Sequence, residues 1–134
     1  MSSARTASPF RSWNGTEPFR IFPTVLVDSI GGEQVLMCRV KYEPGTVVKR
    51  HSHEHTEQVM LITDGEVEMT IGSETAVLRP GDTAVVNRGI EHELRSPGGC
   101  SFIEALAPVP LDHVGDRERD LVLGPDGGRL HVEA

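Results

Sequence analysis

Residues 45–65, GTVVKRHSHEHTEQVMLITDG, contain two short apolar stretches separated by a segment rich in histidine. The stretch ends in Asp64-Gly65, a dipeptide typical of a tight hairpin turn. In the segment that follows, residues 66–71, acidic or hydroxyl side chains alternate with apolar ones, which is typical of a half-buried strand. The pattern predicts two strands joined by a hairpin, each with one face against a core.

Outward from this stretch, the chain continues as short apolar or alternating segments bounded by glycine and proline. These segments are residues 24–30, 34–43, 75–89 (two strands around Pro80-Gly81), 91–95 and 100–106. About nine short strands in roughly 90 residues are typical of a sandwich or barrel closed by Greek-key connections. The expected fold class is therefore all-β.

The amino-acid composition excludes several classes of function. A chain of 134 residues has the size of one domain, and its formal net charge of −7 argues against a nucleic-acid partner. There is no run of about 18 apolar residues and no hydrophobic export signal at the N-terminus, so we expect no membrane partner and a cytoplasmic location. Cys38 and Cys100 each lie in an apolar run, which predicts buried packing for both.

The chain divides into three parts by amino-acid composition and strand pattern. Residues 1–20 are expected to be an N-terminal arm, residues 21–110 the β-barrel, and residues 111–134 a C-terminal extension that packs on the barrel or on a partner subunit. Within the extension, the charged run at 116–120 is expected to form one helical turn, and 129–133 an edge strand.

The histidine-rich segment contains the strongest candidates for functional residues. Three histidines lie within eight residues together with an acid and an amide that could act as ligands; the five residues are His51, His53, His55, Glu57 and Gln58. On an extended chain the side chains at positions i and i+2 share a face, so the imidazoles of His51 and His53 can converge on one point. Imidazole is a ligand that suits Zn, Cu, Fe and Ni, and the arrangement therefore favours a metal site.

Two spaced motifs extend this pattern. They read Gly45-x5-His51-x-His53-x4-Gln58-x6-Gly65 and, later, Gly81-x5-Asn87-x-Gly89-x2-His92. Their spacing and order resemble the paired signature motifs of the cupin family, and the surrounding strand pattern extends the resemblance to residues 24–107. The resemblance implies a cupin-type double-stranded β-helix, a jelly-roll barrel.

The resemblance also implies a metal site inside the barrel. In cupins the two histidines of the first motif, the acid or amide that follows and the histidine of the second motif hold one metal. Here those residues are His51, His53, Gln58 and His92. We expect one divalent transition metal ion, Zn, Ni, Mn or Fe.

The chain departs from the family pattern at two positions. Asn87 replaces the usual proline, which should change a turn and no ligand. Gln58 stands where the family usually has glutamate, while Glu57 precedes it. Adjacent side chains on a strand face opposite ways, so only one of the two can reach the metal. We favour Gln58; the alternative is a bulge that turns Glu57 inward.

Strand parity also suggests which residues surround the metal. Met60 and Ile62 share the parity of Gln58 and are expected to line the substrate pocket with Cys38 and Val40.

Two further residues are candidates for moving a proton. Tyr42 is either a proton donor at the barrel mouth or a packed side chain. Glu104 is either on an outer face or a buried acid with a raised pKa. His55 is either exposed, which we favour, or at the rim of the pocket, and His113 and His131 are expected at the surface.

The ligand set indicates a reaction class. Three neutral imidazoles and a neutral amide leave a bound ion its full positive charge, which favours Lewis-acid activation of a carbonyl. The set resembles that of Gln-ligated cupins that rearrange or cyclise sugars and polyketides. We therefore expect an enzyme that isomerises, cyclises or eliminates on an oxygenated small molecule. The alternatives are a dioxygenase acting on a flavonol-like or diketone substrate, and a non-catalytic binding protein.

Oligomeric state is predicted from one strand. The segment VMLIT, residues 59–63, has apolar side chains on both faces, more than a half-solvated sheet requires. We expect a homodimer that covers one sheet.

Overall fold

A computed structural model describes residues 8–121. The chain forms ten strands in this range: β1 (Phe19–Phe22), β2 (Val25–Gly31), β3 (Leu36–Tyr42), β4 (Thr46–His51), β5 (Glu57–Gly65), β6 (Val67–Ile71), β7 (Glu74–Leu78), β8 (Thr83–Val86), β9 (His92–Ser96) and β10 (Cys100–Ala107). Three short helices complete it: η1 (Trp13–Gly15), η2 (Leu111–His113) and α1 (Arg117–Asp120). None of the described helices is long and apolar enough to cross a lipid bilayer.

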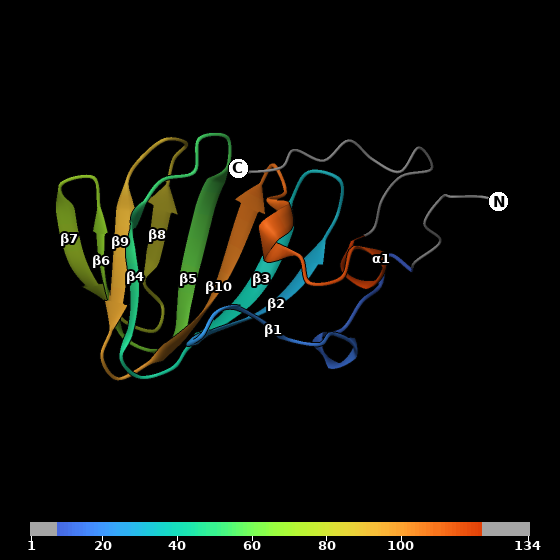
Figure 1. Ribbon diagram of the computed structural model, residues 1–134, viewed down its shortest axis with the longest axis horizontal. Coiled ribbons are helices and arrows are strands. Elements are labelled where there is room, and N and C mark those ends of the chain that lie inside the picture. Colours follow the sequence, from blue (N-terminus) through green and yellow to red (C-terminus); the bar gives the residue numbers. More distant parts are fainter. Residues whose placement is uncertain (1–7, 122–134) are drawn as a thin grey trace.

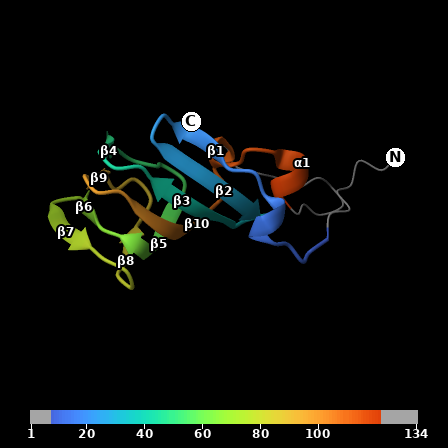
Figure 2. The same ribbon diagram turned by 90° about the horizontal axis from the view of Figure 1, so that it is seen from below.

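The strands form two antiparallel sheets (Figures 1 and 2). The large sheet has the order β1-β2-β3-β10-β5-β8 and the small sheet the order β4-β9-β6-β7. Alternate residues of β3, β5 and β10 are buried, and together with buried residues of β6 and β9 they form one hydrophobic core. The two sheets confirm the predicted all-β jelly roll. Side chains that alternate with a period of two bury one face of each sheet.

The chain crosses repeatedly between the sheets, and one of these crossings stands where the sequence predicted a hairpin. Asp64-Gly65 does not make a hairpin, because β5 belongs to the large sheet and β6 to the small one. Asp64 and Gly65 instead pair with Ser101 and Cys100 of β10. Gly65 has a φ of +70°, and a Cβ there would collide with the carbonyl oxygen of Gly99. Glycine is required at position 65 because the chain crosses between the sheets there against the turn that contains Gly99. The local dipeptide pattern does not reveal this contact.

The N-terminal segment joins the large sheet. Phe19, inside the expected arm, begins β1, which pairs with β2. The guanidinium of Arg39 stacks over the ring of Trp13 at 4.8 Å from its centroid, so this segment docks on the barrel itself.

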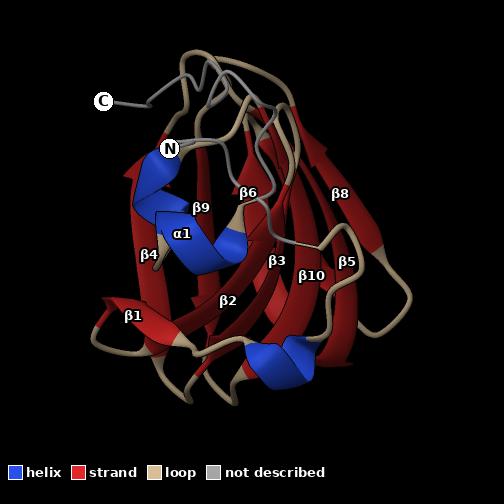
Figure 3. Cartoon of the chain, turned by 90° about the vertical axis from the view of Figure 1, so that its right-hand side faces the viewer, coloured by secondary structure: helices blue, strands red, loops and turns tan. Residues whose placement is uncertain are grey.

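The described part of the C-terminal extension packs on the same barrel. The charged run forms α1 as expected, and α1 lies in front of β2 in Figure 3. The buried carboxylate of Asp120 pairs with Arg119, and the buried Leu121 forms a β-bridge with Gly31. His131 and the expected strand at 129–133 lie outside the described residues. The two cysteines, Cys38 and Cys100, are buried and free, as predicted.

Candidate metal centre

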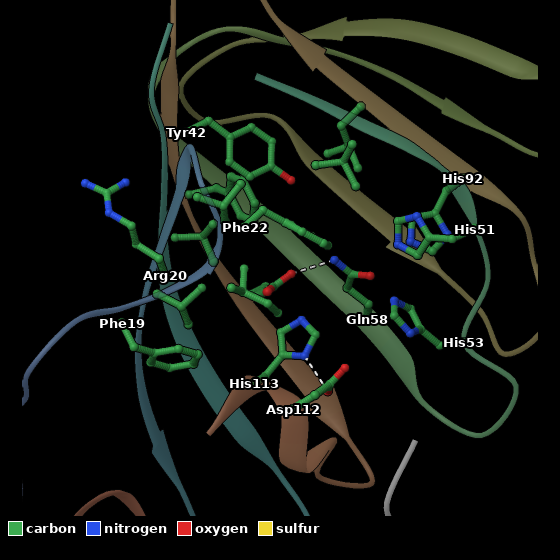
Figure 4. Close-up of a pocket in the computed structure, with 18 of the residues that line it drawn as sticks. Phe19, Arg20, Phe22, Tyr42, His51, His53, Gln58, His92, Asp112 and His113 are labelled. Carbon is green, nitrogen blue, oxygen red and sulfur yellow. Dashed lines mark hydrogen bonds and ion pairs between the residues drawn. The ribbon is translucent and has the colours of Figure 1, made fainter. Parts of the chain in front are cut away.

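Three histidines meet at one end of the barrel (Figure 4). His51 ends β4, His92 begins β9, and these two residues are direct partners in the antiparallel pair. His53 lies two residues beyond β4 and turns its ring to the same place. One nitrogen from each of the three imidazoles lies within 4.8 Å of the others, a spacing that one metal ion could bridge.

Two of the imidazoles are held by the backbone. The Nδ1 atom of His51 lies 2.6 Å from the carbonyl oxygen of Lys49, and Nδ1 of His92 lies 3.0 Å from that of Ile90. A carbonyl only accepts hydrogen bonds, so Nδ1 donates in both residues and Nε2 keeps its lone pair for a ligand. Burial, together with the neighbouring His51 and His53, lowers the pKa of His92 to about 4, which keeps this imidazole neutral at neutral pH.

Gln58 supplies the fourth ligand candidate. It is buried on β5, and its Nε2 donates to Oε1 of Glu104 on β10 at 2.5 Å. The Oε1 atom of Gln58 is buried without a hydrogen-bond partner among the described residues. Figure 4 shows this oxygen on the side of the amide that faces the histidines. A buried carbonyl oxygen without a donor is unfavourable, and a divalent cation would satisfy it, so the residues present fit a metal.

The neighbouring acids lie on the other side of the sheets. Glu57 is exposed, as expected from its opposite parity to Gln58. Glu91 and Glu93, on either side of His92, form ion pairs with Arg50 on the outside. The acids that line the cavity with the histidines are therefore the buried Glu104 behind Gln58 and Asp112.

The histidines and Gln58 open into a cavity of about 710 Å³. Of the four expected pocket residues, only Val40 lines it. Cys38, Met60 and Ile62 are buried in the core but do not line this cavity, which corrects the expectation for them. Parity identifies the face of a strand, but it does not show at which level along the barrel the interior is open.

Both expected proton-transfer residues line the cavity. Burial, and then the charge of Glu104, raise the pKa of Tyr42 well above its ordinary value, so the phenol stays protonated. Its ring packs edge-on against Phe102 at 5.2 Å. Glu104 is a buried acid, one of the two alternatives open from the sequence, and burial raises its pKa.

His113, expected at the surface, lies instead in the cavity wall. Its ring packs edge-on to that of His53, with centroids 6.3 Å apart. Its Nδ1 donates to Oδ1 of Asp112 at 2.8 Å. Burial is the largest influence on the pKa of His113 and lowers it, but the Asp112 hydrogen bond and the charges of Glu104 and Asp112 outweigh it and raise the pKa overall. His113 belongs to no strand, so no periodic pattern could have placed it.

The N-terminal segment also contributes to the cavity. Phe19, Arg20, Ile21 and Phe22, all of β1, line it (Figure 4). The only sequence signal for this strand is the short alternation of FRIF, which four residues make too brief to separate from a loop.

Comparisons with known proteins agree with this architecture. A family model described as "Cupin domain" matches residues 38–105. The xanthan biosynthesis protein XanB of Xanthomonas campestris pv. campestris is 28% identical over 72 residues, 53% of this chain and 15% of that protein. Protein SchB of Streptomyces halstedii is 28% identical over 83 residues, 58% of this chain and 60% of that protein. The chain thus spans less than two thirds of either relative.

Solved structures share the fold. An RmlC-like cupin from Shewanella frigidimarina superimposes with a TM-score of 0.74 at 22% identity, covering 82% of this chain and 99% of that one. KdgF from Halomonas sp. superimposes with a TM-score of 0.68 at 21% identity, covering 72% of this chain and 91% of that one. At these identities the likeness concerns the fold.

Proposed function

The chain belongs to the cupin family, and we propose that it is a metal-dependent enzyme that isomerises, cyclises or eliminates on a carbonyl-bearing small molecule. His51, His53, His92 and Gln58 would hold one divalent transition metal ion, Zn, Ni, Mn or Fe. Such an ion acts as a Lewis acid, which polarises a carbonyl oxygen and favours loss of a neighbouring proton.

The observation that carries this proposal is the state of the Gln58 amide. Its nitrogen is occupied by Glu104, and its buried oxygen has no hydrogen-bond donor among the described residues. A side chain in that state beside three clustered imidazoles is explained by a cation that takes the oxygen as a ligand. All four ligands are neutral, which keeps the ion a strong Lewis acid.

The other polar residues of the cavity suit the handling of a proton. Tyr42, with its raised pKa, donates a hydrogen bond to a substrate oxygen but does not serve as a base. His113, held by Asp112 through Nδ1, can take or return a proton at Nε2. Glu104 accepts a hydrogen bond from Gln58 and orients that amide.

The names of the relatives give weak guidance to the substrate. The Xanthomonas relative is named for xanthan biosynthesis, which concerns sugars, but the match covers 15% of that protein. The name therefore does not decide between sugar and polyketide substrates.

Metal titration tests the ligand set. We expect equilibrium dialysis with Mn, Fe, Ni or Zn, followed by elemental analysis, to give one ion per chain. His53→Ala should abolish binding, and Gln58→Leu should weaken it by about 10- to 100-fold, because each removes a ligand. Glu57→Leu is the matched control for Gln58→Leu, since its side chain is exposed, and it should bind as the parent chain does. Equal binding by the parent chain and His53→Ala would refute the proposal.

Turnover tests the reaction class. Protein loaded with Zn or Ni is incubated without oxygen with dicarbonyl, keto-sugar and polyketide compounds, and products are followed by mass spectrometry. We expect an isomeric, cyclised or dehydrated product that is absent with His92→Ala. Turnover that requires oxygen would identify a dioxygenase instead, and tight binding without conversion would identify a binding protein.

A further inference from the structure

The cavity has two unlike ends (Figure 4). At one end stand the three imidazoles, Gln58 and the Asp112–His113 pair. The other end is hydrocarbon. It is formed by Phe22 of β1, Val25 and Val27 of β2, Val40 of β3 and Phe102 of β10, all from the large sheet.

The hydrocarbon end offers few hydrogen-bonding side chains. The Tyr42 hydroxyl faces the cavity there, and Figure 4 marks no hydrogen bond from it to another of the residues drawn. The Arg20 guanidinium donates through Nη1 to Glu43 Oε2 at 2.8 Å and to the carbonyl oxygen of Pro23 at 2.7 Å, which holds that nitrogen at the surface. Apart from the Tyr42 hydroxyl, the Arg20 guanidinium and the Glu104 carboxylate, a ligand at this end meets carbon.

This composition discriminates between classes of carbonyl compound. A sugar carries a hydroxyl on almost every carbon, and each hydroxyl pressed against hydrocarbon without a partner weakens binding by roughly tenfold or more. An aromatic or conjugated body has no such groups, and its burial against valine and phenylalanine is favourable. A cavity of about 710 Å³ is within the usual range for such ligands.

Much of the hydrocarbon end comes from residues outside the family match at 38–105. Phe22, Val25 and Val27 all precede it. The terminal segments hold β1 in place: a Cβ on Gly115 would lie 2.6 Å from the ring of Phe19, and Arg119 donates to the carbonyl oxygen of Glu17 at 3.2 Å. Three of the five apolar wall residues thus lie in segments that precede the matched region.

We infer that the substrate is an enolisable carbonyl compound with an apolar, aromatic or conjugated body, and not a polyhydroxylated sugar. The inference rests on the proposed function for the site at which the carbonyl binds, whereas the apolar wall selects the body of the molecule.

Two diketones with the same head test the inference. Binding of 2,4-pentanedione and 1-phenyl-1,3-butanedione to the Zn-loaded protein is measured by calorimetry, with fructose as the polyhydroxylated probe. We expect the phenyl compound to bind at least tenfold more tightly than pentanedione, and fructose to show no saturable binding at millimolar concentration. Equal affinities of the two diketones, or fructose binding as tightly as the phenyl compound, would overturn the inference.

Matched variants locate the effect. Phe22→Ser removes a ring from the cavity wall, and it should reduce the preference for the phenyl compound by about fivefold or more. Phe10→Ser makes the same change at a residue that is 88% exposed and lines no part of the cavity, and it should leave the preference unchanged. Val40→Thr, nearly isosteric, adds a hydroxyl to the wall and should also weaken the phenyl compound selectively. Unchanged preference in both cavity variants would overturn the inference.

The design separates the two proposals. Dependence of pentanedione binding on Zn tests whether the carbonyl end lies at the metal. The ratio of the two diketone affinities tests the apolar wall, and it can be measured whether or not Zn contributes.

Discussion

The amide of Gln58 stands between two unlike neighbours, the carboxylate of Glu104 and the three imidazoles. The carboxylate accepts a hydrogen bond from the amide nitrogen. This bond directs the amide oxygen toward the histidines. An amide without this partner could turn either end to the metal. We therefore propose that Glu104 acts on the candidate metal site through Gln58 as a positioning residue.

Replacing Glu104 should weaken metal binding without unfolding the protein. For Glu104→Leu we expect the affinity for Zn to fall by about 10- to 100-fold, because the amide loses the partner that orients it. The free energy of unfolding of the metal-free protein should fall by about 1–3 kcal/mol, because the buried Nε2 of Gln58 loses its acceptor, which is too little to unfold the chain. Competition with a coloured chelator measures the affinity, and urea denaturation measures the stability.

The double variant provides the control. If Glu104 acts only through Gln58, adding Glu104→Leu to Gln58→Leu should not weaken Zn binding further. Additive losses would contradict the positioning role.

At the scale of the elements, β5 carries both a ligand candidate and the crossing to the small sheet. Its far end pairs with β10 up to Gly65, whose backbone lies against Gly99 and Cys100. Gly45, between β3 and β4, also crosses between the sheets with a positive φ, of +88°, but a Cβ there would meet nothing within 4 Å. The two glycines share a backbone conformation and differ in their surroundings.

This pair of glycines separates conformational strain from steric collision. Gly45→Ala should lower the free energy of unfolding by about 1–2 kcal/mol, the cost of a left-handed alanine. Gly65→Ala should lower it by about 1–3 kcal/mol more, because its Cβ must also displace the β9–β10 turn. Urea denaturation of both variants measures the difference, and equal losses would show that the turn yields freely.

At the scale of the whole molecule, the large sheet presents an apolar outer face. Val59, Leu61 and Val85 are each more than 40% exposed, and Val59 and Val85 are cross-strand partners on β5 and β8. Val35, just before β3, and Met37 on β3 are similarly exposed, and β10 separates β3 from β5 in the sheet. We propose a second copy of the chain as the cover of this face, because a two-fold contact uses the same patch on both subunits.

The dimer is tested by a charge placed on the patch. Light scattering of the parent chain at micromolar concentration should give twice the chain mass, and Leu61→Arg should give a monomer, because the arginine would be buried unpaired in the interface. Val47→Arg is the control, since Val47 is exposed on the small sheet. A monomeric parent chain would contradict the prediction.

Short-range spacing was sufficient to predict an all-β sandwich or barrel, the convergence of His51 and His53, and the inward face of Gln58, whereas the jelly roll and the place of His92 were implied by the resemblance to the cupin motifs. The reason is geometric: an extended strand places alternate side chains on one face, so position along the chain sets direction. The partner of Gln58 could not be read in this way, because parity left Glu104 either inside or outside.

The remaining features depend on contacts between segments far apart in the chain. His113 reaches the cavity because η2 returns over the barrel, and β1 walls the cavity because it pairs with β2. Asp64-Gly65 crosses between sheets because β10 occupies the hydrogen bonds that a hairpin would need. Local patterns carry no information about which distant strand will take those bonds, and packing of the complete chain settles it.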